Sequence, residues 1–115
     1  MSDIKDLSAK LLKFTDERDW DQFHTPKDLA ISLVLEASEV LEQFQWKKKK
    51  EIQDHIKTNK EELGEELADV AIYLFLLADK LDIDLGEAIE DKRKKNAKKY
   101  PINKSRGSAK KYNKL

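Results

Sequence analysis

The chain has 115 residues, of which 40% are charged and none is cysteine, and its formal net charge is zero. This length, with no glycine- or proline-rich linker, favours one domain with a modest core, and the absence of cysteine excludes a disulfide framework, a thiol nucleophile and a cysteine-based zinc site. The amino terminus carries no apolar signal segment and no apolar run approaches the roughly 20 residues of a membrane span, so we expect a soluble, cytoplasmic protein.

Charge is distributed unevenly along the sequence. All 23 acidic residues lie at positions 1–91 with 12 basic ones, a balance of −11, whereas positions 92–115 hold the other 11 basic residues and no acid, a balance of +11. Such a tail can bind nucleic acid, fold back towards an anionic ligand held at an acidic site, or stay solvated as chain termini often do.

Hydrophobic periodicity predicts a first helix over residues 4–19 and a second from residue 26 to about 45. Leu7, Leu11, Leu12 and Phe14 are the buried candidates of the first helix. The second has a clear start, because Thr25 is a good N-cap, Pro26 suits the first helical position, and Asp28 stands where a capping box has its acid.

After an interruption at residues 47–50, a short helical piece is expected over residues 51–57. Thr58 with Glu61 reads as a capping box that opens a third helix with a heptad-like apolar seam, made of Leu63, Leu67, Val70, Leu74, Leu77 and Leu81. A fourth helix starts after Asp84 and must stop by Tyr100, because Pro101 follows. Beyond Pro101 no periodicity remains. The expected fold is an all-α antiparallel four-helix bundle.

Two pairs of acids stand at helical spacing, Glu36-x-x-Glu39 and Glu66-x-x-Asp69. Residues three apart share one face of a helix, and at ~100° per residue both pairs fall on the same flank of their apolar stripes. Antiparallel packing of the two helices would therefore bring all four carboxylates together. Crowded carboxylates repel one another unless a cation lies between them, and oxygen ligands are what Mg²⁺ prefers. The pattern predicts a magnesium site in a phosphate-ester enzyme. Taken alone, each acid is equally consistent with a solvated surface charge.

Neighbouring residues suggest a nucleotide around this site. Trp20, His24, Trp46 and Tyr73 are candidates to stack on a base or contact it, although tryptophans at helix ends often serve only as packing caps. On the basic side, Lys92, Asn96 and Tyr100 supply donors suited to phosphate oxygens. The sequence has no P-loop, no G-x-G-x-x-G and no Ser/His/Asp grouping. Neither His24 nor His55 stands in the Glu-x-x-His pattern of a ferritin-like di-iron site.

The residues quoted so far carry a resemblance to a known family. The E-x-x-E pair, a 26-residue spacer and the E-x-x-D pair resemble the MazG-like nucleoside triphosphate pyrophosphohydrolases. The flanking segments resemble the dCTP pyrophosphatase branch over nearly the whole chain: Glu17-Arg18-Asp19-Trp20-x-Gln22-Phe23-His24, Phe44-Gln45-Trp46, Lys92-x-x-x-Asn96, Tyr100-Pro101 and Ser108-x-Lys110-Lys111-Tyr112-x-x-Leu115. The segment Lys47 to Lys57 departs from the family pattern.

The resemblance implies a helical bundle that assembles as a homotetramer, a dimer of dimers, and hydrolyses a deoxynucleoside triphosphate, dCTP or a related pyrimidine nucleotide, to the monophosphate and pyrophosphate. It implies that Mg²⁺ is bound by the catalytic acids Glu36, Glu39, Glu66 and Asp69. It implies a substrate pocket made of Trp20, His24, Trp46, Tyr73, Lys92, Asn96, Tyr100 and Lys111. The general base stays open between Glu36, Glu39 and Glu65.

Residues 1–101 are expected to form the catalytic domain and residues 102–115 a basic tail. The competing hypothesis is a non-enzymatic helical oligomer that binds nucleic acid through this tail. Self-association is also expected from apolar residues that lie off the main seams of the second and third helices, Ile31, Leu35, Ile72 and Phe75.

Overall fold

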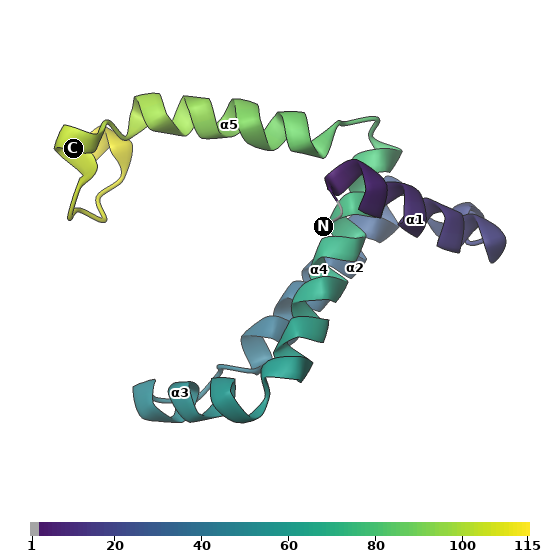
Figure 1. Cartoon of the computed structure of the whole chain (residues 1–115), viewed down its shortest axis with the longest axis horizontal. Helices are drawn as coiled ribbons and strands as arrows, with labels where there is room; N and C mark the ends of the chain where they lie inside the picture. The colour runs from purple at the N-terminus through teal and green to yellow at the C-terminus, as the bar shows by residue number, and fades with distance from the viewer. Residues whose placement is uncertain (1–2) are drawn as a thin grey trace. The chain divides into compact units, whose positions relative to one another are not determined.

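The computed structural model describes residues 3–115, which form helices and connecting segments and contain no strand. The elements follow the chain as shown in Figure 1: α1 (Ile4–Glu17), the 3₁₀ turn η1 (Asp21–Phe23), α2 (Pro26–Glu42), α3 (Lys49–Thr58), α4 (Lys60–Lys80), α5 (Leu85–Lys99), α6 (Ile102–Ser105) and η2 (Tyr112–Lys114). The all-α prediction is confirmed. No helix in this part of the chain is long and apolar enough to cross a membrane.

The chain divides into two compact units, Met1–Ile83 and Asp84–Leu115. In the first unit α2 and α4 lie side by side (Figure 1), and α1 and α3 each contact α4. Buried apolar side chains come from the two long helices, with Leu29 on α2 and Leu63, Leu76 and Ala78 on α4. The α2–α4 pair is therefore the centre of the unit. The expected boundary between residues 101 and 102 stays a prediction.

Side-chain caps fix where the helices begin. The Thr25 hydroxyl accepts the backbone N–H of Asp28 at 3.1 Å and so caps α2, with Pro26 at its first position. Asp84 accepts the N–H of Glu87 at 3.0 Å and caps α5 in the same way. In each case the side-chain oxygen satisfies a donor that has no partner within the helix. Both predicted starts are confirmed.

The predicted cap at Thr58 is wrong. Thr58 is the last residue of α3, and its hydroxyl donates backwards to the carbonyl of Asp54 at 3.1 Å. Asn59 instead ends α3 and begins α4. A threonine hydroxyl can bond the backbone of either the preceding or the following turn. Because α3 continues to Thr58, the hydroxyl bonds a carbonyl of the preceding turn.

Two helix ends and the segment after Pro101 also differ from the prediction. The first helix ends at Glu17 and the second at Glu42, because Asp19 and Trp46 beyond them have left-handed backbones, with φ of 53° and 67°. After Pro101 the short α6 and η2 add helical turns where none was expected.

Burial is lower than the periodicity predicted. Leu7 and Phe14 of α1 are exposed, and so are Leu67, Leu74 and Leu81 of the α4 seam. A seam with a heptad rhythm needs a partner along its whole length. These side chains have no such cover within the first unit.

Candidate functional site

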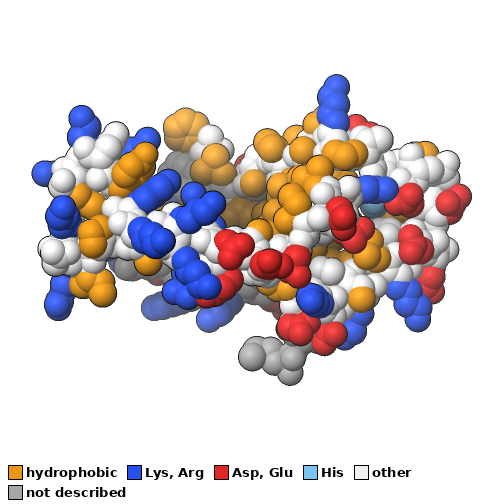
Figure 2. Space-filling view, turned by 90° about the horizontal axis from the view of Figure 1, so that it is seen from above, with side chains coloured by type: hydrophobic (Ala, Val, Ile, Leu, Met, Phe, Trp, Pro, Cys, Tyr) orange, Lys and Arg blue, Asp and Glu red, His pale blue; other side chains and the backbone are white. Residues whose placement is uncertain are grey.

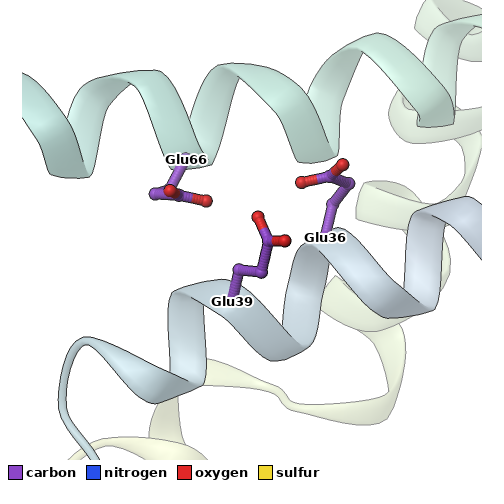
Figure 3. Close-up of side chains that lie close together, drawn as sticks. All are labelled: Glu36, Glu39 and Glu66. Carbon is purple, nitrogen blue, oxygen red and sulfur yellow. The ribbon is translucent and has the colours of Figure 1, made fainter.

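The α2–α4 pairing brings the two acid pairs together. Glu36 and Glu39 project from successive turns of α2, and Glu66 projects from α4 towards them, as Figure 3 shows. Along the pair, Glu39 interacts with Glu66, while Glu36 lines a pocket with Asp69. Because the later residue of one helix meets the earlier residue of the other, the helices are antiparallel. This is the orientation on which the predicted convergence of the acids depends.

Three of the four acids form a tight cluster. Carboxylate oxygens of Glu36, Glu39 and Glu66 all lie within 4.8 Å of one another. Glu36 and Glu66 are half-buried, and Glu39 is exposed. Asp69 lies beside this cluster without being one of the three. We refer to Glu36, Glu39 and Glu66 as the carboxylate cluster.

The electrostatics of the cluster favour the binding of a cation. Burial, followed by contact with the Glu39 carboxylate, raises the pKa of Glu36 above its ordinary value, and the charges of Asp69 and Glu66 act in the same direction. For Glu66 the contact with Glu39 is the largest cause of a raised pKa, followed by burial. The negative charge of the nearby Glu62 also raises the pKa of Glu66.

Two carboxylate oxygens of the cluster indicate whether a metal ion fits there. One Oε atom of Glu36 and one of Glu66 are buried and have no hydrogen-bond partner. Buried carboxylate oxygens without a partner are costly. Hard anionic oxygens that converge in this way match the ligand set of Mg²⁺, which is held by a few carboxylates with the rest of its shell left to water and phosphate. The residues present therefore fit the predicted ion.

A pocket of about 310 Å³ adjoins the carboxylate cluster. Glu36 and Asp69 form part of its wall, so one pocket contains both carboxylates and apolar surface. The remaining lining comes from α1, the α1–α2 connection and α4: Leu11, Phe14, Thr15, Trp20, His24, Ile72, Tyr73 and Leu76. Three predicted substrate residues, Trp20, His24 and Tyr73, are therefore placed together beside the acids.

Edge-to-face contacts arrange the aromatic wall of this pocket. The Trp20 ring meets Phe14 with centroids 5.6 Å apart and His24 at 6.4 Å. The short turn between Trp20 and His24 is tied to the end of α4, because Asp21 forms an ion pair with Lys80. The Lys80 ammonium also lowers the pKa of the Asp21 carboxyl. This ion pair connects the α1–α2 segment, which carries Trp20 and His24, to α4.

Trp46 is not among the residues that line the pocket. Its side chain is 89% exposed. Trp46 follows the C-terminal end of α2, whereas His24 precedes the N-terminal end of that helix. Since α2 has 17 residues and so is ~25 Å long, the two residues stand at opposite ends of that helix. The structure of one chain does not bring Trp46 to the predicted base site.

The predicted phosphate-side residues all belong to the second unit. Lys92 and Asn96 line a shallow hollow on α5 with Leu85, Ala88, Ile89 and Arg93. Tyr100 ends α5 and meets Tyr112 edge to face at 6.2 Å, with the Lys99 ammonium 4.9 Å from the Tyr112 ring. Lys111 is exposed at the start of η2. Figure 2 shows lysine and arginine side chains gathered over α5 and the C-terminal segment.

Sequence reasoning missed part of the pocket. The apolar pattern assigns Leu11 and Phe14 to the core of the first helix and gives Thr15 no role. Thr15 is buried, and its hydroxyl donates to the Leu12 carbonyl at 2.9 Å. A buried threonine within an apolar stripe is a weak signal, and nothing in the sequence distinguishes a pocket floor from a core.

The chain is similar to several known proteins. The model of the MazG-like family matches residues 31–115. The chain is 44% identical to dCTP pyrophosphatase 1 of Mus musculus and 41% identical to that of Homo sapiens, in both cases over 100% of this chain and 67% of the relative. A crystal structure of a pyrophosphatase from Archaeoglobus fulgidus superposes with a TM-score of 0.81 at 41% identity and covers 88% of this chain and 94% of that one.

Proposed function

Since the chain belongs to the MazG-like family and is a nucleotide pyrophosphohydrolase, we propose that its substrate is a deoxynucleoside triphosphate, dCTP or a related pyrimidine nucleotide. The bond broken is the one between the α- and β-phosphates, and the products are the monophosphate and pyrophosphate. The relatives are dCTP pyrophosphatases, which supports cytosine as the base, and the pocket beside the acids supports a nucleotide as the class of substrate.

One observation carries this proposal: the carboxylate cluster and the aromatic pocket share a wall. Glu36 contributes to both, and Asp69 lines the pocket next to it. A nucleoside triphosphate needs this combination, because its base seeks a flat apolar surface while its phosphates carry the charge that a metal neutralises.

The carboxylate cluster with Asp69 is the proposed Mg²⁺ site. When bound, the ion would neutralise phosphate charge and make a water molecule more acidic. The chain's own residues supply the rest of the proposed reaction. Trp20, His24 and Tyr73 hold the base, and a carboxylate accepts the proton of the water that attacks the α-phosphorus in line with the leaving pyrophosphate. Glu36, Glu39 and Glu65 are the candidates for that acceptor.

Lys92, Asn96, Tyr100 and Lys111 are the proposed phosphate-side residues. Lysine ammonium, asparagine amide and tyrosine hydroxyl groups all donate to phosphate oxygens. Their basic surroundings support this assignment, because positions 92–115 contain 11 basic residues and no acid.

The active form is proposed to be a homo-oligomer, a tetramer built as a dimer of dimers. Two features support self-association. Ile31, Val34 and Leu35 leave an apolar hollow open on α2, with side chains 47%, 67% and 58% exposed. In addition, Trp46 can serve a base pocket only in a second copy, because it stands a helix length from His24 of its own chain.

The test of the proposed function is incubation with each of the four dNTPs, with and without Mg²⁺, followed by chromatography of the products. We expect dCMP and pyrophosphate from dCTP, only with the ion. Orthophosphate as the first product would contradict cleavage at the α–β bond, and equal rates on all four nucleotides would contradict the base preference.

A further inference from the structure

A network of side-chain hydrogen bonds around His55 connects three helices. His55 lies near the end of α3 and is half-buried. Its Nε2 is 2.7 Å from Gln43 Oε1, and its Nδ1 is 3.0 Å from Asn59 Nδ2. The Phe44 ring packs against the imidazole edge to face, at 6.3 Å. None of these residues belongs to the predicted site, and the segment that contains His55 is the one that departs from the family pattern.

The donors and acceptors of this network fix the form of the histidine. The oxygen of the Gln43 amide only accepts hydrogen bonds, and the nitrogen of the Asn59 amide only donates them. A neutral imidazole with its hydrogen on Nε2 satisfies both contacts at once. Asn59 Nδ2 also lies 3.1 Å from the His55 carbonyl oxygen. The same nitrogen lies 2.9 Å from Thr58 Oγ1. Asn59 makes no side-chain cap on α4, so its amide bonds residues of α3.

The two partners of His55 stand at the ends of the helices that carry the acids. Gln43 is the C-cap of α2 and comes one turn after Glu39. Asn59 is the residue at which α4 begins, two turns before Glu66. His55 therefore connects the end of one acid-bearing helix to the start of the other. It does so at the end of the hairpin where Glu39 meets Glu66.

We propose that His55 is a positioning residue for the metal site. Together with Gln43 and Asn59 it forms what we call the His55 clamp, which holds α2 against α4 so that Glu39 and Glu66 stay within reach of one ion. The inference rests on the proposed metal role of the carboxylate cluster. A clamp is needed there because the three carboxylates repel one another, and Glu39 at this end is exposed and has little packing to hold it.

The alternative is that His55 only stabilises the fold. The two roles differ in what they change. A purely structural residue alters the melting temperature and leaves the metal affinity of the folded protein alone. A positioning residue weakens metal binding in protein that is still folded.

The decisive experiment measures Mn²⁺ binding to nucleotide-free protein by calorimetry and electron paramagnetic resonance. The variants are His55→Leu, which keeps an apolar contact with Phe44, and Gln53→Leu, a matched change at an exposed position of α3. We expect Kd for Mn²⁺ to rise about tenfold in His55→Leu, at the low end of the loss seen when outer groups that orient metal ligands are removed. Gln53→Leu should bind as the unchanged protein does. In turnover, KM for Mg²⁺ should rise while kcat at saturating Mg²⁺ changes less than about twofold.

Milder variants keep the inference testable if His55→Leu folds poorly. Gln43→Ala and Asn59→Ala each open one side of the clamp and should each weaken Mn²⁺ binding. Gln43→Ala should have no further effect once His55 is leucine, because contacting residues of one network are not additive. Unchanged Mn²⁺ affinity in these variants, or equal loss in Gln53→Leu, would overturn the clamp alone. No Mn²⁺ binding to the unchanged protein would overturn the proposed metal site, and the clamp's role with it.

Discussion

At the scale of single residues, Glu39 is the central member of the carboxylate cluster. It contacts both Glu36 and Glu66, and in each case it raises the pKa of its neighbour. An exposed acid that faces two half-buried ones is well placed to share an ion with both. Losing its charge should therefore affect the whole site.

We expect Glu39→Gln and Asp69→Asn to lower Mg²⁺-dependent turnover by about 100-fold or more, since each removes a ligand charge and keeps the shape of the side chain. Pyrophosphate release and far-UV circular dichroism on the same samples check this. The exposed Glu42→Gln on α2 is the control and should be fully active. Full activity in either site variant would remove that residue from the metal site.

The raised pKa values of Glu36 and Glu66 predict how stability depends on pH. A carboxyl group whose pKa is higher in the folded state than in the unfolded chain binds its proton more tightly when folded, so the free energy of unfolding rises as pH falls. For glutamate the ordinary value is 4.5. Metal-free protein should therefore melt at a higher temperature at pH 5 than at pH 8.

Two comparisons test the origin of that slope. Saturating Mg²⁺ should remove it, because a bound cation favours the ionised carboxylates. Glu36→Gln should also reduce it. If the melting temperature of the metal-free protein stays flat or falls between pH 8 and pH 5, the like-charge repulsion described for the carboxylate cluster is not present in solution.

Trp46 gives a further prediction at this scale. If it stacks on the base in the assembled enzyme, Trp46→Ala should raise KM for dCTP with a loss of ~1–3 kcal/mol, the usual contribution of one base stack. Steady-state kinetics with saturating Mg²⁺ measure this. The matched change Ile102→Ala, at a side chain that is 81% exposed in the second unit, should leave KM alone. An unchanged KM in Trp46→Ala would return the tryptophan to a packing role.

At the scale of helices, the start of α2 determines where its two acids lie. The helix begins at the Thr25 cap, and Glu36 and Glu39 follow at fixed spacing from it. Thr25→Ala should lower the free energy of unfolding by about 1 kcal/mol, since the Asp28 N–H loses its partner. Urea denaturation measures it. Thr58→Ala is the contrast: its hydroxyl bonds the preceding turn, so the loss should be no more than about 0.5 kcal/mol.

The capping pattern explains how much of the fold could be predicted. Thr25, Pro26 and Asp84 are local signals, because cap and helix are neighbours in sequence, and both predicted starts are correct. The ends of α1 and α2 were missed because Asp19 and Trp46 adopt left-handed backbones. Tryptophan rarely does so, aspartate does so more readily, and no short-range pattern predicts either case.

The candidate site could be predicted where it depends on helical spacing. The E-x-x-E and E-x-x-D pairs fixed the face of each helix, and antiparallel packing then placed Glu36, Glu39 and Glu66 together. The His55 clamp could not be found in this way. It depends on how three helix ends meet, and the spacing of Gln43, His55 and Asn59 follows no helical repeat.

At the scale of the whole molecule, the first unit buries few apolar side chains and leaves many exposed. Only four hydrophobic side chains among the described residues are buried, whereas the hollow on α2 leaves Ile31, Val34 and Leu35 exposed. A small domain rarely leaves such a patch open to water. A second copy of the chain is the proposed cover.

Light scattering at micromolar concentration should therefore show an assembly larger than a monomer. Val34→Glu should shift it towards monomer, because a charge is costly to bury in an apolar contact. Ile102→Glu makes the same chemical change on α6, outside the proposed contact, and should assemble normally. A monomer for the unchanged protein would contradict the proposed oligomer.

The backbone of Trp46 links these scales. The left-handed backbone of Trp46, with φ of 67°, costs roughly 1–3 kcal/mol relative to a relaxed conformation. Within one chain the indole is exposed, so its burial does not offset this strain. Glycine would adopt the same backbone without that strain. If Trp46 contacts the base in the proposed assembly, the position is a trade-off between stability and activity. Selection for a more stable monomer would then remove the tryptophan, and selection for turnover would keep it.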